Sequence, residues 1–179
     1  MIPRRFKYKK QSIMEKTRRR IVTKIGDVFC IEIDGQYKCY FQYIANDMEC
    51  LNSSVIRIFK KKYPMDFEPD IDAIVNGEIG FYAHTILKAG ISDNIWYKVG
   101  KSKQIGNLEG IFFGLTNDEF LKPMPKVSNN WYVWKLGGKM VKVGKLEGIY
   151  KGVEIGMVFN YRRIIYRITK GKYPYPYPE

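Results

Sequence analysis

The strongest local constraint in the sequence is the dipeptide Asp34-Gly35, which separates two runs of β-branched and aromatic residues over positions 24–45. Such a pair favours the two-residue type I′ turn of a β-hairpin, because both central residues of that turn need a positive φ. With these two residues as the loop, Cys30 lies opposite Cys39 in a cross-strand pair whose side chains are close. The sequence therefore predicts a hairpin with two neighbouring thiols on one face.

Side chains alternate between the two faces of a strand, and in this register both faces of the hairpin are largely apolar. One face carries Val28, Cys30, Tyr37, Cys39, Phe41 and Tyr43, and the other carries Phe29, Ile31, Ile33, Tyr40 and Ile44. Such a strand pair is typical of a sheet that is covered on both sides. We therefore expect the hairpin in the core and the functional surface elsewhere: on the acidic segment 66–72, on the loop 116–130 or on the basic N-terminal arm.

Further strand-forming runs follow the hairpin, and fourteen Tyr and ten Phe also favour strands. Strands are predicted at about 55–59, 79–88, 95–99, 111–115, 131–136, 139–143, 155–159 and 164–168. One short helix is predicted at about 70–76, because Pro69-Asp70 is a favourable helix start. The predicted fold class is mainly β, or α+β at most: a twisted antiparallel sheet or partly open barrel built from hairpins, with one or two short helices.

The positive charge of the chain is concentrated at its start. The formal net charge is +13, and residues 1–24 hold ten Lys/Arg against one acidic residue. We expect a basic arm over 1–20, a single β-rich globular domain over 21–172 and a Tyr-Pro tail over 173–179. Proline at every second position forces the tail into an extended path, which we expect to cross the body through its tyrosine rings.

Basic residues interleave with aromatic residues in the arm and again in residues 160–173. Lys and Arg neutralise phosphates and Tyr stacks on unpaired bases, so the pattern supports a nucleic-acid-binding module. The candidate contacts are Arg18, Arg19, Arg20, Arg162, Arg163 and Arg167. A solvated arm, and an edge strand with outward-facing arginines over 160–173, account for the same residues without any ligand.

The sequence offers little catalytic chemistry. His84 is the only histidine and lies in an apolar strand, which is more typical of a structural residue than of a Cys–His dyad. No P-loop, nucleophile elbow or closely spaced Cys/His pairs for zinc occur. We expect a non-enzymatic protein without cofactor or metal. No apolar stretch is long enough to span a membrane and no secretory signal is present, so we expect a cytoplasmic protein with reduced thiols.

The segment Lys24 to Phe29, the alternating Ile31 and Ile33, a turn, and the tyrosine-rich strand from Tyr37 to Gln42 resemble the opening of the immunity protein 26 family. The resemblance implies a small bacterial protein that neutralises a polymorphic toxin, in many cases a nuclease. It implies a steric mechanism, in which a β-rich domain plugs the active site of the toxin, and it supplies no catalytic residues.

Inhibitors of nucleases are often acidic because they mimic the phosphate chain, whereas this chain is basic. Either the target is not a nuclease, or the contact lies on the acidic segment 66–72. In the second case the partner-binding residues are Asp66, Glu68, Asp70 and Asp72. A solvated loop with helix-capping acids explains the same four residues without a partner, and a metal site would need carboxylates that converge. Two functions therefore remain as the main hypotheses, a toxin-binding immunity protein and a nucleic-acid-binding module, and an unrecognised enzyme is kept as a third in reserve.

Overall fold

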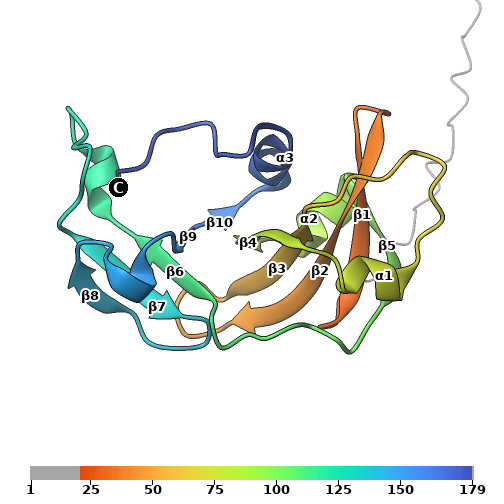
Figure 1. Ribbon diagram of the computed structural model, residues 1–179, viewed down its shortest axis with the longest axis horizontal. Coiled ribbons are helices and arrows are strands. Elements are labelled where there is room, and N and C mark those ends of the chain that lie inside the picture. Colours follow the sequence, from red (N-terminus) through yellow and green to blue (C-terminus); the bar gives the residue numbers. More distant parts are fainter. Residues whose placement is uncertain (1–20, 179) are drawn as a thin grey trace, which may run out of the picture.

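The computed structural model of the chain describes residues 21–178, in which ten strands form two sheets beside three α-helices and two 3₁₀-helices (Figure 1). The strands are β1 (Asp27–Ile33), β2 (Tyr37–Asp47), β3 (Ser53–Phe59), β4 (Ile79–Thr85), β5 (Trp96–Lys101), β6 (Phe112–Leu115), β7 (Trp131–Lys135), β8 (Val141–Gly144), β9 (Glu154–Ile155) and β10 (Val158–Phe159). The helices are α1 (Ile71–Val75), α2 (Leu87–Ser92), α3 (Tyr161–Lys170), η1 (Asn117–Phe120) and η2 (Gly148–Tyr150). The predicted mainly β class is confirmed, with the described strands in two open, mixed sheets.

The first sheet has the strand order β10-β4-β3-β2-β1-β5, and the second has the order β8-β7-β6-β9. All neighbours are antiparallel except β10 with β4 and β9 with β6. Figure 1 shows the two sheets side by side along the long axis of the molecule, with α3 over one face of the first sheet. The predicted short helix is present as α1, and Asp70 is its N-cap.

The hairpin predicted at Asp34-Gly35 is present, but its loop contains one more residue than the prediction allowed. Asp34 and Gly35 have φ values of 50° and 66°, as a primed turn requires. The backbone N–H of Gln36 donates to the carbonyl of Ile33 at 2.8 Å. Gln36 then stays outside the ladder, and Ile33 pairs with Tyr37. The strand register is therefore shifted by one residue from the predicted one.

This register separates the two cysteines that the sequence placed side by side. Cys30 lies opposite Tyr40 instead of Cys39, so the predicted pair of neighbouring thiols on one face is wrong. The observed register gathers the odd-numbered residues of both strands on one face, where Phe29 stacks on Phe41 with 5.1 Å between ring centroids. A one-residue slip would move a whole strand face out of that core, so the hydrophobic pattern outweighs the preference for a two-residue loop.

Both faces of the hairpin are buried, as the alternation predicted. One face contributes Phe29, Ile31, Ile33, Cys39, Phe41 and Tyr43 to a core that α2 and α3 cover through Leu87 and Ile164. The other contributes Val28, Cys30 and Tyr40 to a smaller core that α1 covers through Ile74 and Val75. We therefore still expect the functional surface outside the hairpin, on segments that surround these two cores.

Three predicted strand segments near the chain's centre and end take another form. The strand expected at 79–88 ends at Thr85, and α2 follows at once. The strand expected at 164–168 is wrong, because residues 161–170 form α3. Asn160 caps this helix by accepting from the N–H of Arg163, and Gly171 ends it with a φ of 74°.

None of the helices in residues 21–178 is long and apolar enough to cross a membrane.

The third misassigned segment, 155–159, is divided between the two sheets at Gly156. β9 pairs with β6 in the second sheet, and β10 pairs with β4 in the first. Gly156 is buried between them, and a Cβ at this position would overlap the indole ring of Trp134. The absence of a side chain thus lets the chain cross from one sheet to the other against a buried ring.

The Tyr-Pro tail continues from α3 along the body. The ring of Tyr173 stacks on Phe159 at 3.9 Å between centroids, and the ring of Tyr177 lies 5.8 Å from that of Trp131. Tyr173 is 5% exposed. The tail therefore contacts one strand of each sheet through its tyrosine rings. Its prolines require the extended course that makes this possible.

Gly156→Ala should destabilise the fold, because the added methyl group must displace the buried ring of Trp134. Overpacking of this kind costs about 1–3 kcal/mol. Gly110→Ala is the matched control, since an added Cβ at Gly110 has nothing within 4 Å. Urea denaturation should show a lower midpoint for the first variant and an unchanged midpoint for the second. Equal midpoints would contradict the packing of Gly156 on Trp134.

Candidate partner-binding site

The acidic segment lies between β3 and α1, and the aromatic residues Tyr63 and Phe67 attach it to the first sheet. Tyr63 pairs with Lys38 of β2 through two backbone hydrogen bonds of 2.8 and 2.9 Å. The ring of Phe67 lies 4.3 Å from that of Tyr63, and the Nζ of Lys38 donates to the carbonyl of Phe67 at 3.2 Å. The backbone that carries the first two acidic residues is therefore fixed to the sheet.

α1 fixes the second half of the segment. Asp70 accepts from the N–H of Ala73 at 3.0 Å and begins the helix. The helix is fastened at its other end by Arg57, whose Nη2 donates to the carbonyl of Val75 at 3.2 Å. Arg57 is only 3% exposed and also donates to the carbonyl of Gln104, so it ties α1 to the loop after β5. Asp70 thus has a structural role that the other three acids do not share.

Asp66, Glu68 and Asp72 are exposed, and none of them has an ion pair within residues 21–178. We call these three residues the acidic ridge. Because its backbone is fixed and its carboxylates are unpaired, the ridge presents negative charge in a preorganised form. No group of three or more His, Cys, Asp or Glu in the described residues is arranged to hold a metal ion.

The lysines that precede the ridge are engaged with other groups. Lys60 pairs with Glu78 at 2.7 Å. Lys61 and Lys62 lie over the rings of Tyr63 and Tyr37, at 4.8 and 4.5 Å from the ring centroids. Contacts of this kind are weak at an exposed site, but each keeps its lysine beside another partner. Among the described residues the basic run therefore makes no ion pair with the acidic ridge.

The candidate nucleic-acid contacts fall into two groups, of which the structure describes one. Arg18, Arg19 and Arg20 lie outside the described residues. The three arginines of α3 differ in their surroundings, because a helix and not a strand carries them.

Arg162 is exposed, whereas Arg163 lies over the ring of Tyr175 at 4.7 Å from its centroid. Arg167 is half-buried: its Nη1 donates to Glu154 at 2.6 Å and its guanidinium covers the ring of Phe81 at 4.1 Å. The guanidinium of Arg167 thus makes its contacts within the protein.

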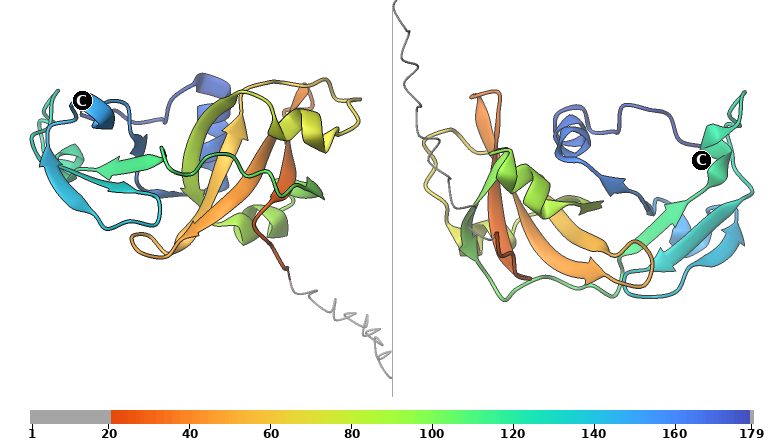
Figure 2. Two further views of the ribbon diagram at one scale, coloured as in Figure 1. Left: turned by 60° about the horizontal axis from the view of Figure 1, so that its bottom comes forward. Right: turned by 180° about the vertical axis from the view of Figure 1, so that it is seen from behind.

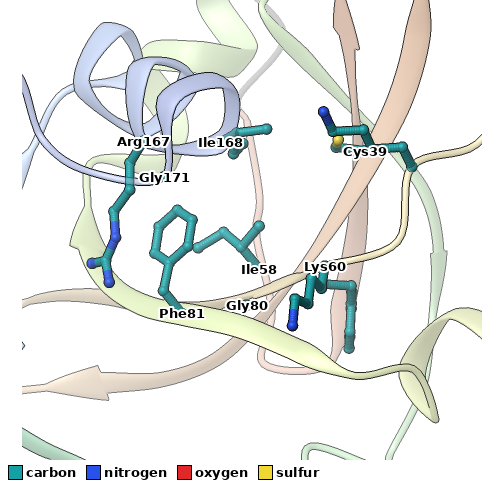
Figure 3. A pocket seen from close by; sticks show the side chains of 10 residues that line it. Cys39, Ile58, Lys60, Gly80, Phe81, Arg167, Ile168 and Gly171 are labelled. Carbon is teal, nitrogen blue, oxygen red and sulfur yellow. The ribbon is translucent and has the colours of Figure 1, made fainter. Parts of the chain in front are cut away.

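A small pocket of about 210 Å³ opens between α3 and the strands β3 and β4 (Figure 3). Its lining includes Cys39, Ile58, Lys60, Phe81 and Arg167. Two of the three cations in the lining, Lys60 and Arg167, have carboxylate partners, and the third, Lys62, lies over the ring of Tyr37. Burial raises the pKa of the Cys39 thiol to about 11, so the thiol stays protonated near neutral pH and is a poor nucleophile. The pocket therefore lacks the reactive thiol that thiol catalysis would use.

His84 lies in a buried contact between the sheets. Its Nε2 is 2.9 Å from Oδ2 of Asp47, and the Nε1 of Trp134 donates to the same oxygen at 2.8 Å. His84 and Asp47 are both 0% exposed. Since the carboxylate accepts, the Nε2 of His84 carries the proton. No atom of this group reaches the surface, so His84 is a structural residue of the core.

The loop 116–130 meets the tail, and this meeting forms a second pocket that no local motif indicated. It measures about 380 Å³ and has Glu119, Phe120, Met124, Met157, Tyr175, Pro176 and Tyr177 in its lining. These residues are far apart in the sequence, so only the fold brings them together. The sequence signal that could have found them is the aromatic and apolar content of both segments.

Comparison with known proteins relates the chain to one family. A family model described as Immunity protein 26 matches residues 24–116, about half of the chain. The match begins just before β1 and ends just after β6, so it includes the acidic segment. No curated protein and no solved structure matches the chain.

His84 should make stability depend on pH, because burial lowers its pKa below the ordinary value and its Nδ1 has no hydrogen-bond partner. In the unfolded chain the pKa is about 6.5. The contribution is therefore fully present above that value and is lost as the pH falls below it. The free energy of unfolding should drop by about 1.4 kcal/mol per pH unit below pH 6.5, until the folded-state pKa is reached.

Urea denaturation between pH 7.5 and 5.5 measures this slope. The chain has a single histidine, so no other imidazole titrates in this range. His84→Gln keeps an N–H donor for Asp47 but cannot be protonated, and its slope should be flat. An equal slope in both proteins would show that another group causes it.

Arg167→Ala should destabilise the fold, because it removes a hydrogen-bonded partner of the half-buried Glu154. Charge-assisted hydrogen bonds contribute about 1.5–3 kcal/mol. Arg162→Ala, on the exposed face of the same helix, should stay within about 0.5 kcal/mol of the wild type. Thermal denaturation of the two variants compares them directly. The same loss in both would contradict a structural role specific to Arg167.

Proposed function

Because the chain belongs to the immunity protein 26 family, we propose that it binds a protein toxin and neutralises the toxin by covering its active site. The mechanism is steric, and the immunity protein catalyses no reaction. The encounter takes place in the bacterial cytoplasm, where the toxin would otherwise act on the cell.

The acidic ridge is the proposed contact, and it is the single observation that carries this choice of surface. Asp66, Glu68 and Asp72 are exposed, unpaired among the described residues, and fixed by the anchored backbone beneath them. A fixed backbone reduces the conformational freedom that this segment loses when it binds a complementary surface. The ridge also lies within the part of the chain that the family model matches.

A basic cleft is the surface that fits this ridge best. Enzymes that cleave nucleic acids line their substrate site with Lys and Arg because the phosphate chain is negative. Three carboxylates on a preorganised segment present the same sign of charge as that chain. This complementarity favours a nuclease toxin, with the ridge placed where the phosphates would lie.

Co-expression with the toxin encoded by the adjacent gene tests the function. The immunity protein should protect the cell and should co-purify with the toxin domain. The absence of both protection and a complex would overturn the proposal.

Replacing the acidic ridge should slow association with the toxin. The triple variant Asp66→Asn, Glu68→Gln, Asp72→Asn keeps the cap residue Asp70 and removes three negative charges. We expect an association rate lower by about tenfold at low salt, with a difference that shrinks as salt screens the charges. Surface plasmon resonance with the toxin domain at several salt concentrations measures both effects.

A matched triple variant controls for net charge. Glu49→Gln, Asp93→Asn and Glu147→Gln change three exposed carboxylates on other parts of the surface and alter the net charge equally. Its association rate should stay within about twofold of the wild type. If both triple variants slow association equally, the ridge is not the contact, although the immunity function itself would stand.

A further inference from the structure

The pocket between the loop 116–130 and the tail has walls of two kinds. Its apolar wall comes from Phe120, Met124 and Met157, and its aromatic wall comes from Tyr175 and Tyr177. Tyr175, Pro176 and Tyr177 form one side of the pocket, and Figure 2 shows where this C-terminal end of the described chain lies. A volume of about 380 Å³ is at the small end of the range of ligand pockets and can hold one long side chain.

One carboxylate interrupts this apolar lining. Glu119 has no ion pair within residues 21–178, and its Oε2 is buried without a hydrogen-bond partner. Burial raises the pKa of this carboxyl group, and the neighbouring Tyr177 hydroxyl partly offsets the effect. A buried acceptor without a donor costs about 1–3 kcal/mol. A bound cation that donates to Oε2 would remove this cost.

The tyrosine rings supply a second feature that favours a cation. The centroids of the Tyr175 and Tyr177 rings are 6.2 Å apart, and both rings line the pocket. Tyr175 already has the guanidinium of Arg163 near it, at 4.7 Å from the ring centroid. Aromatic faces attract guanidinium and ammonium groups, and the attraction grows when water is excluded.

The pocket is preformed because polar contacts fix the loop that bears Glu119. Asp118 accepts from the hydroxyl of Ser128 at 2.6 Å and from the side-chain amide of Asn130 at 3.2 Å. Its own N–H donates to the hydroxyl of Thr116. Thr116, Asp118 and Ser128 are buried, so η1 keeps its position without a ligand. A preformed pocket adds little ordering cost to binding.

The rim of the pocket is suited to a protein rather than to a free small molecule. Phe120 is 73% exposed and Leu121 is 54% exposed, so η1 presents large apolar side chains to solvent. Apolar groups around a central charged or aromatic anchor are the usual composition of a binding hot spot. The rim would pack against the partner while the pocket receives a single anchor residue.

We propose that this pocket receives an arginine or lysine side chain of a protein partner, with the aliphatic stem against Met124 and Met157 and the cationic group at Glu119. Only the identity of the partner rests on the proposed function, since the toxin is the protein that the family leads us to expect. The pocket can be tested without any toxin, so its failure is separate from failure of the immunity function.

The probes are n-butylguanidinium and n-butylammonium, with n-butanol as the neutral analogue. NMR titration of the methionine ε-methyl signals in the whole protein follows Met124 and Met157 directly. At least one cation should bind saturably at this pair of methyl groups, with a Kd on the order of 1 mM. Butanol should bind at least fivefold more weakly.

Glu119→Gln keeps the size of the side chain and removes the charge, so it should weaken cation binding at least fivefold. Glu49→Gln, on an exposed carboxylate away from the pocket, should leave the Kd unchanged. Tyr177→Leu gives a second variant, which removes a ring face and should also weaken binding. The proposal is overturned if neither cation shifts the two methyl signals, if butanol binds as tightly, or if Glu119→Gln binds as the wild type does.

Discussion

The two sheets are held together at a carboxylate that has no access to water. Asp47 ends β2 in the first sheet and accepts from His84 of β4 and from Trp134 of β7 in the second sheet. Phe113 and Ile44 pack around the same place, so the polar contact lies inside an apolar cluster. A buried carboxylate is costly unless donors surround it, and these two donors can reach it only when both sheets are in place. The contact therefore specifies how the sheets meet.

The course of the chain near its end follows from this joint. The indole ring of Trp134 packs directly on the backbone of Gly156, at the position where the chain leaves β9 for β10. Any side chain at this position would overlap the ring. The return to the first sheet brings α3 over the large core and leaves the tail to run back toward the loop 116–130. The pocket around Glu119 thus depends on Gly156, because the close packing of Gly156 on the Trp134 ring sets the course of the chain toward the tail.

Local sequence signals predicted the fold where one physical effect dominated. The Asp34-Gly35 turn and the cap at Asp70 were found because each depends on neighbouring residues alone. The hairpin register was missed because turn geometry and burial of the odd-numbered residues favoured different pairings, and burial prevailed. Part of the helix α3 was taken for a strand because β-branched isoleucines occupy three of the five positions 164–168. Its true signals were Asn160, Gly171 and the helical spacing of Tyr161, Ile164 and Ile168.

The acidic segment could be identified from sequence because its charges stand at every second position over seven residues, although only the structure separates the capping role of Asp70 from the ridge. The pocket at Glu119 could not be identified from sequence, because its lining comes from a loop and from a tail that lies far along the chain. Figure 1 places α1 and η1 at opposite ends of the long axis. Charges interact through physiological salt over only about 8 Å, so the ridge does not steer a ligand into the pocket. A single partner that uses both must therefore extend along the molecule, with the ridge governing the rate of encounter and the pocket the lifetime of the complex.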